Sequence, residues 1–238
     1  MRTKKMKETP DFLFDEFKHL GVDFDSSVQV EQFDRKQGTS VERDNALLDR
    51  FGVTPNHLLV DVGCGTGHFA CQAALRCAAV HAVDVSPAML HAGRRRADAL
   101  GVQNITFHHA GFLTYEHTAG LADFVTTKSA LHHLPDFWKV VALRRIHDML
   151  REGGALYLRD AIFSFPPEEY VAGCRDLIDS FGRDDGQGFT KSEYATHIRE
   201  EFSTYDWLMD CMLTKAGFEI VEKKLPRTTS AEYICRRP

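Results

Sequence analysis

Glycines and carboxylic acids form the clearest chemical pattern in this sequence. Gly63, Gly65 and Gly67 alternate after an apolar run, and Asp61 stands two residues before the first of them. Glycines at this spacing indicate a sharp turn, where the backbone bends and another group approaches closely. A buried strand precedes the turn and an Ala-rich helical register follows it. The pattern therefore predicts a nucleotide-type pocket at the carboxyl end of a strand.

The spacing excludes two common nucleotide motifs and adds a second acid. The dinucleotide fingerprint G-x-G-x-x-G would place its third glycine at position 68, which is His68. A P-loop would need Gly-Lys-Ser/Thr after the turn, and none follows. Asp84 ends a second expected strand over residues 80–83, about twenty residues beyond the glycines. Its carboxylate is placed to accept hydrogen bonds from both hydroxyls of a ribose.

These residues resemble a known family. Asp61-x-Gly63-x-Gly65-x-Gly67 and the stretch from Ala82 to Leu90 are similar to the first two motifs of the class I S-adenosylmethionine-dependent methyltransferases. The resemblance covers residues 58–235 and is strongest in their first half. It implies a Rossmann-like α/β fold: a seven-stranded, mostly parallel sheet with an antiparallel last strand, helices on both faces and a helical cap. It also implies a set of residues that bind S-adenosylmethionine: Asp61, Gly63, Gly65, Gly67, Asp84, Met89, Gly111, Phe112 and Lys128.

Two of these positions depart from the family. At the place of Gly111 most relatives carry an Asp that accepts a hydrogen bond from the adenine amino group, which glycine cannot do. The backbone N–H and the ring of Phe112 remain beside the base. One lost hydrogen bond costs on the order of 1 kcal/mol, so binding should be weakened and not abolished. Lys128 replaces a small residue, and its cation either holds a carboxylate of cofactor or substrate or faces solvent.

Two adjacent histidines follow the fourth expected strand, over residues 123–127. The run that contains His132 and His133 is similar to a stretch of many small-molecule methyltransferases. Imidazole titrates near neutral pH, so either ring is a candidate general base; the alternative is that both only pack and form hydrogen bonds. Asp160 ends the fifth expected strand. It is a candidate catalytic carboxylate on the acceptor side, or it pairs with the adjacent Arg159.

Composition limits the other functions. The 6 cysteines form no C-x-x-C pair, and the Asp184–Asp185 loop has too few ordered oxygens for calcium, so we expect no metal. The net charge of -5 without a basic stripe argues against nucleic acid. No apolar run is long enough for a signal peptide or a membrane helix, so we expect a cytoplasmic protein with no membrane association.

The elements around the motifs define the expected organisation. Residues 12–20 and 41–51 show helical spacing, and residues 33–37 between them form either a lid segment or a solvated connector. We expect an N-terminal helical lid over residues 1–52 and a methyltransferase domain over residues 53–238.

An insertion after the fifth strand is the expected substrate cap, over residues 164–202. Thr190 and Glu193 fit a capping box at the start of one of its helices.

The expected function is methyl transfer from S-adenosylmethionine to an unidentified small-molecule acceptor. In this reaction the protein mainly aligns two reactants in a dry site. An RNA-modifying methyltransferase and a non-catalytic S-adenosylmethionine-binding protein are the alternatives. The sequence identifies neither the acceptor nor the oligomeric state.

Overall fold

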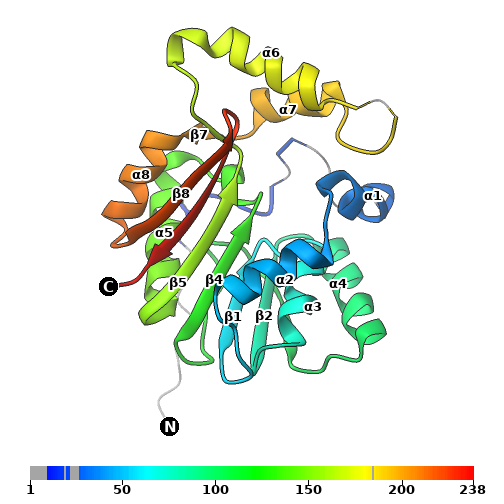
Figure 1. The fold of residues 1–238 in the computed structure, drawn as a ribbon, viewed down its shortest axis with the longest axis vertical. Coiled ribbons are helices and arrows are strands. Elements are labelled where there is room, and N and C mark those ends of the chain that lie inside the picture. Colours follow the sequence, from blue (N-terminus) through cyan, green and yellow to red (C-terminus); the bar gives the residue numbers. More distant parts are fainter. Residues whose placement is uncertain (1–9, 19, 22–26, 184) are drawn as a thin grey trace.

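Seven strands form one twisted sheet that organises the chain (Figure 1). A computed structural model describes residues 10–18, 20–21, 27–183 and 185–238. The strands lie in the order β3-β2-β1-β4-β5-β9-β8. Their bounds are β1 Leu58–Val62, β2 Ala79–Asp84, β3 Ile105–His109, β4 Ala122–Lys128, β5 Leu150–Asp160, β8 Glu219–Arg227 and β9 Ser230–Arg236. Strands β1 to β5 pair in parallel, while β9 is antiparallel to both of its neighbours, β5 and β8. The expected α/β sheet with one antiparallel strand, the last in the chain, is confirmed.

Helices cover both faces of the sheet and bury a separate core on each (Figure 1). On one side, α2, α3 and α4 lie over β1, β2 and β3; on the other, α5 lies over β5 and α8 lies beside β8. These helices are α2 Val41–Arg50, α3 His68–Ala74, α4 Pro87–Leu100, α5 Asp136–Met149 and α8 Asp206–Lys215. The strands of the middle of the sheet are buried on both faces, which explains their nearly continuous apolar runs. Among the described residues, no helix is long and apolar enough to span a membrane.

A cap lies above the carboxyl ends of the parallel strands (Figure 1). It comprises α1 Ser27–Gln37, the short helix η2 Pro167–Glu169, α6 Tyr170–Phe181 and α7 Lys191–Glu200. The capping box predicted for α7 is present, with Thr190 accepting from the Glu193 N–H and Glu193 accepting from the Thr190 N–H. A two-stranded sheet, β6 Ile162–Phe163 with β7 Thr204–Tyr205, ties the two ends of the insertion together, and the sequence did not predict it.

One local prediction is wrong. Residues 10–18 form turns and not the start of a helix, and residue 19 lies outside the described part. The Asp15 carboxylate accepts a hydrogen bond from the Phe17 N–H at 3.1 Å, a local pairing that competes with a helix. Residues 33–37 form the C-terminal part of helix α1. Gly153 and Gly154 lie inside β5, at the place where its pairing register with β4 shifts.

Candidate active site

The glycine turn lies at the carboxyl end of β1, between two neighbouring segments that approach its backbone closely. Gly63, Gly65 and Gly67 all have positive φ, at 74°, 53° and 70°. A Cβ on Gly63 would lie 2.3 Å from the Cβ of Ala130, and one on Gly65 would lie 3.0 Å from the ring of Phe33. Both positions therefore need glycine for conformation and for space. Gly67 instead faces the packing of α3 against α4, which is a structural role.

Asp84 joins the ends of β1 and β2. Its Oδ2 accepts a hydrogen bond from the Gly65 N–H at 2.7 Å, and its Oδ1 accepts one from the Ser86 N–H at 2.9 Å. Ser86 in turn caps α4, where its hydroxyl accepts from the N–H of Met89 at 3.2 Å. The carboxylate is thus held at the edge of the turn, with its orientation set by backbone donors.

One cavity of about 560 Å³ connects the predicted cofactor residues to the histidines. This volume falls within the range of about 300–1,000 Å³ that is typical of ligand pockets. The predicted residues that line it are Gly63, Gly65, Asp84, Met89, Gly111, Phe112, Lys128, His132, His133 and Asp160. The cap closes the cavity with side chains from α1, α6, α7 and the hairpin of β8 and β9.

Asp61 and Lys128 are placed differently from the other predicted cofactor residues. Asp61 is 2% exposed, does not line the large cavity, and accepts from the Thr126 hydroxyl at 2.7 Å. Burial raises its pKa to about 6, against the opposing effects of Lys128 and Thr126. Lys128 forms an ion pair with Asp44 of α2 at 3.1 Å and lies 4.1 Å from the ring centroid of Phe69. Of the roles left open for Lys128, the solvent-facing one is excluded, because its side chain is largely covered.

His132 is held between two carboxylates that line the same cavity. Asp160 accepts from the His132 backbone N–H at 3.0 Å and also bonds its Nδ1, while Nε2 lies 3.1 Å from Glu201 of the cap. Burial alone would lower the pKa of His132, but the two carboxylates raise it to about 10. Burial works against the charge of Asp160 too, yet the His132 cation holds its pKa below the usual value. His132 is therefore an imidazolium at neutral pH.

His133 has the opposite electrostatic character. Burial lowers its pKa to about 4, and the adjacent His132 cation adds to the effect. The two rings lie 4.4 Å apart, centroid to centroid, so one cation and one neutral imidazole stand side by side. At neutral pH His133 is therefore a neutral imidazole.

Glu201, which the sequence did not predict as a site residue, also lines the cavity. It bonds His132 and also Nδ1 of His197 in α7, and hydrogen bonds to these two histidines hold its pKa well below the usual value although burial opposes this. Nitrogen and oxygen atoms of His132, His133 and Glu201 all lie within 4.8 Å of one another, a spacing that a metal ion could bridge. No sequence pattern predicts the cluster of His132, His133 and Glu201, because Glu201 belongs to the insertion and lies far from the histidines in the sequence.

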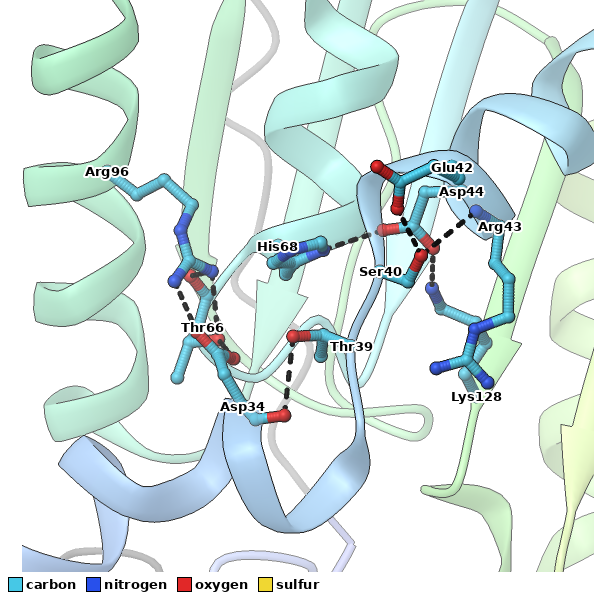
Figure 2. Close-up of polar contacts among 10 residues, drawn as sticks. All are labelled: Asp34, Thr39, Ser40, Glu42, Arg43, Asp44, Thr66, His68, Arg96 and Lys128. Atoms are coloured by element: carbon cyan, nitrogen blue, oxygen red, sulfur yellow. Dashed lines mark hydrogen bonds and ion pairs between the residues drawn. The ribbon is translucent and has the colours of Figure 1, made fainter.

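Ion pairs attach α1 and α2 to the rim of the glycine turn (Figure 2). Asp34 of α1 accepts a hydrogen bond from the Thr66 hydroxyl and forms an ion pair with Arg96 of α4. Arg96 also donates to the carbonyl of Thr66 at 3.1 Å. Asp44 of α2 accepts from both His68 and Lys128. These contacts place α1 against the rim of the glycine turn, and a lid role for residues 33–37 stays a prediction.

Comparisons with known proteins agree with this architecture. Residues 59–154 match a family described as a methyltransferase domain. The chain is 28% identical over 178 residues to the 27-O-demethylrifamycin SV methyltransferase of Amycolatopsis mediterranei, covering 71% of this chain and 63% of that protein. It is 24% identical to the demethylmenaquinone methyltransferase of Bacillus mycoides, with 88% of each chain covered. The magnesium protoporphyrin IX methyltransferase of Synechocystis, solved with bound S-adenosylhomocysteine, shares its fold, with a TM-score of 0.62 at 19% identity over 94% of this chain and 91% of that one.

In residues 59–154 and in its fold, the chain is similar to the class I S-adenosylmethionine-dependent methyltransferases. It spans less than two thirds of the length of several curated relatives, 63% in one case and 54% in another. S-adenosylmethionine is the cofactor of this family, and the site fits it. Gly63 and Gly65 present backbone without side chains to the cavity, and Asp84 presents a carboxylate to the same space.

Proposed function

We propose that this protein transfers the methyl group of S-adenosylmethionine to a small-molecule acceptor. One observation carries the proposal: the glycine turn with Asp84 and the pair His132 and His133 line a single capped cavity. Cofactor and acceptor can thus meet in a space shielded from water, which is the main requirement of this reaction. The cofactor supplies an activated methyl group on a positive sulfur.

The residues of the chain divide the remaining tasks. Asp84 receives the ribose hydroxyls, and Gly63 and Gly65 allow the cofactor to approach the backbone. The His132 imidazolium attracts an acceptor oxygen that carries or develops negative charge, and neutral His133 takes the proton that the acceptor loses. Asp160 fixes the orientation of His132. Asp61 and Lys128 attract each other electrostatically and so support the glycine turn.

The acceptor class follows from the cap and from the relatives. Aromatic side chains of the cap, Phe181, Phe189 and Tyr194, line the cavity together with polar groups, which favours a partly aromatic molecule. The relatives named for 27-O-demethylrifamycin SV and aklanonic acid support a hydroxylated or acidic acceptor of this kind. All six cysteines are free thiols, which supports a reducing, cytoplasmic location.

Transfer of a labelled methyl group tests the proposal. The protein is incubated with methyl-labelled S-adenosylmethionine and a panel of phenols, enols, carboxylic acids, amines and bulk RNA. We expect label in one of the small-molecule classes, and loss of it in the His133→Phe variant. Labelling of RNA alone would favour the nucleic-acid alternative. Tight cofactor binding with no labelled product from any class would favour the non-catalytic alternative.

A further inference from the structure

A carboxylate from the N-terminal segment fills the space that a side chain at position 111 would take. A Cβ built on Gly111 would lie 2.3 Å from Oε2 of Glu16 and 2.4 Å from its Cδ. Glycine at 111 and glutamate at 16 are thus complementary, although 95 positions separate them in the printed sequence. Any residue larger than glycine would displace the Glu16 carboxylate from this place.

Backbone donors hold the Glu16 carboxylate. Its Oε1 accepts from the N–H of Thr114 at 2.8 Å, from the Thr114 hydroxyl at 2.6 Å and from the N–H of Leu113 at 3.1 Å. Its Oε2 accepts from the N–H of Leu113 at 3.0 Å and faces Gly111. A carboxylate oxygen has two lone-pair sites, so Oε2 retains acceptor capacity on the side of the cavity.

The strand order locates this oxygen relative to a bound nucleoside. Asp84 ends β2 and Gly111 follows the neighbouring strand β3, and both line the same cavity as Glu16. A ribose whose hydroxyls bind Asp84 therefore leaves its base one strand further along, beside Gly111. The buried ring of Phe112 and the side chain of Met89 line the cavity there.

We propose that Glu16 accepts a hydrogen bond from the 6-amino group of the cofactor's adenine, and so selects this base. An ionised carboxylate only accepts, so it favours a base that donates at position 6. A base with a 6-oxo group would place two acceptors against each other, which costs affinity. The inference rests on the proposed function, because it assumes that the cavity binds an adenosyl group. It makes the N-terminal segment over residues 10–18, which carries Glu16, part of the cofactor site.

Two ligands and two variants test this role by calorimetric titration. The ligands are S-adenosylhomocysteine and S-inosylhomocysteine, which carries a 6-oxo group in place of the amino group. We expect the wild type to prefer the adenosyl ligand by about tenfold. The Glu16→Ala variant should bind both ligands with similar affinity. In Glu16→Gln the amide oxygen stays on the donors of Thr114 and the NH₂ group faces the cavity, so the preference should reverse.

The ratio of the two affinities distinguishes base selection from a purely structural role, in which Glu16 acts as a latch that only attaches the N-terminal segment to residues 113–114. A latch would weaken both ligands equally in the Glu16 variants and leave their ratio unchanged, which would overturn the proposal. Asp11→Asn, which removes a charge from an exposed position on the same segment, is the matched control and should keep the wild-type ratio. Failure of the wild type to bind S-adenosylhomocysteine would instead refute the proposed function, and this assignment with it.

Discussion

The carboxylate of Asp160 accepts hydrogen bonds from both the backbone N–H and the Nδ1 of His132. It therefore fixes the position of the ring and its protonation at once. Glu201 completes the arrangement from the cap, at 3.1 Å from Nε2. The acceptor end of the cavity is an electrostatic unit built from the sheet and the insertion together.

The two carboxylates around His132 predict that this imidazole titrates at an unusually high pH. The folded-state pKa of His132 is raised to about 10, so its contribution to the free energy of unfolding is complete below the unfolded value of about 6.5. That contribution is lost as the pH rises through about 10. Nitrogen-15 NMR should show a His132 imidazolium above pH 8.

The Glu201→Gln variant provides the control for this titration. Because Glu201 is one of the two groups that raise the His132 pKa, its removal should move the NMR midpoint to a lower pH. The alkaline loss of stability should begin earlier by the same amount. A His132 ring that is neutral at pH 7 in the wild type would contradict the account.

His133 should control chemistry without controlling cofactor binding. Because its burial-lowered pKa keeps it neutral, its loss removes the proton acceptor, and we expect the His133→Phe variant to lose methyl transfer by about 100-fold or more. Affinity for S-adenosylhomocysteine should change less than threefold, or about 0.6 kcal/mol. The variant His91→Phe, at an exposed position on α4, should behave as wild type. Equal loss of binding and turnover would mean that His133 supports only the fold.

The contact of Gly63 with Ala130 predicts a stability cost. Gly63→Ala should lower the free energy of unfolding by about 1–3 kcal/mol beyond the backbone cost alone, because the new Cβ would meet Ala130 at 2.3 Å. Gly52→Ala is the matched control, since Gly52 has a φ of +61° with nothing within 4 Å of an added Cβ. Urea unfolding of both variants measures the difference. Equal losses would show that the loop carrying Ala130 moves aside freely.

The attachment of α1 through Arg96 predicts a change in cofactor kinetics. Arg96→Ala removes the ion pair to Asp34 and the bond to Thr66, so α1 should open more often. We expect S-adenosylhomocysteine to dissociate about three to ten times faster, with little change in its association rate. Arg95→Ala, at the exposed neighbouring position, is the control in stopped-flow measurements. Unchanged dissociation would mean that α1 does not retain the ligand.

The sequence predicted the parts of the site that local patterns encode. The strand-turn-helix around Gly63 and the acid at Asp84 depend on neighbours in the chain, and both lie where they were expected. Glu16 and Glu201 could not be found in this way. Each acts through contacts with residues far along the chain, and isolated glutamates in polar stretches carry no periodic signal. The helix expected over residues 12–20 is not formed in residues 12–18, again because of contacts distant in the sequence. Glu16 binds backbone donors at residues 113–114, and these contacts outweigh the helical spacing of the segment.

The cluster of His132, His133 and Glu201 has a spacing that could bind a metal ion, and this can be tested. We expect no metal in the working enzyme, because a protonated His132 between two carboxylates has no lone pair for a ligand bond. Methyl transfer should therefore be unchanged after treatment with a chelator and after addition of Zn²⁺, Fe²⁺ or Ni²⁺ at equimolar concentration. Loss of activity on chelation, restored by one of these ions, would assign His132, His133 and Glu201 as ligands instead.

Calorimetric titration of S-adenosylhomocysteine into the wild type and the Asp84→Asn variant tests the central claim most directly. The side-chain amide of the variant retains one oxygen for the backbone donors but lacks the charge that binds both ribose hydroxyls. The account predicts micromolar binding at one site per chain, weakened about tenfold or more in the variant, with both proteins folded by circular dichroism. No binding by the wild type, or equal affinity in the variant, would contradict a cofactor site built on Asp84 and the glycine turn.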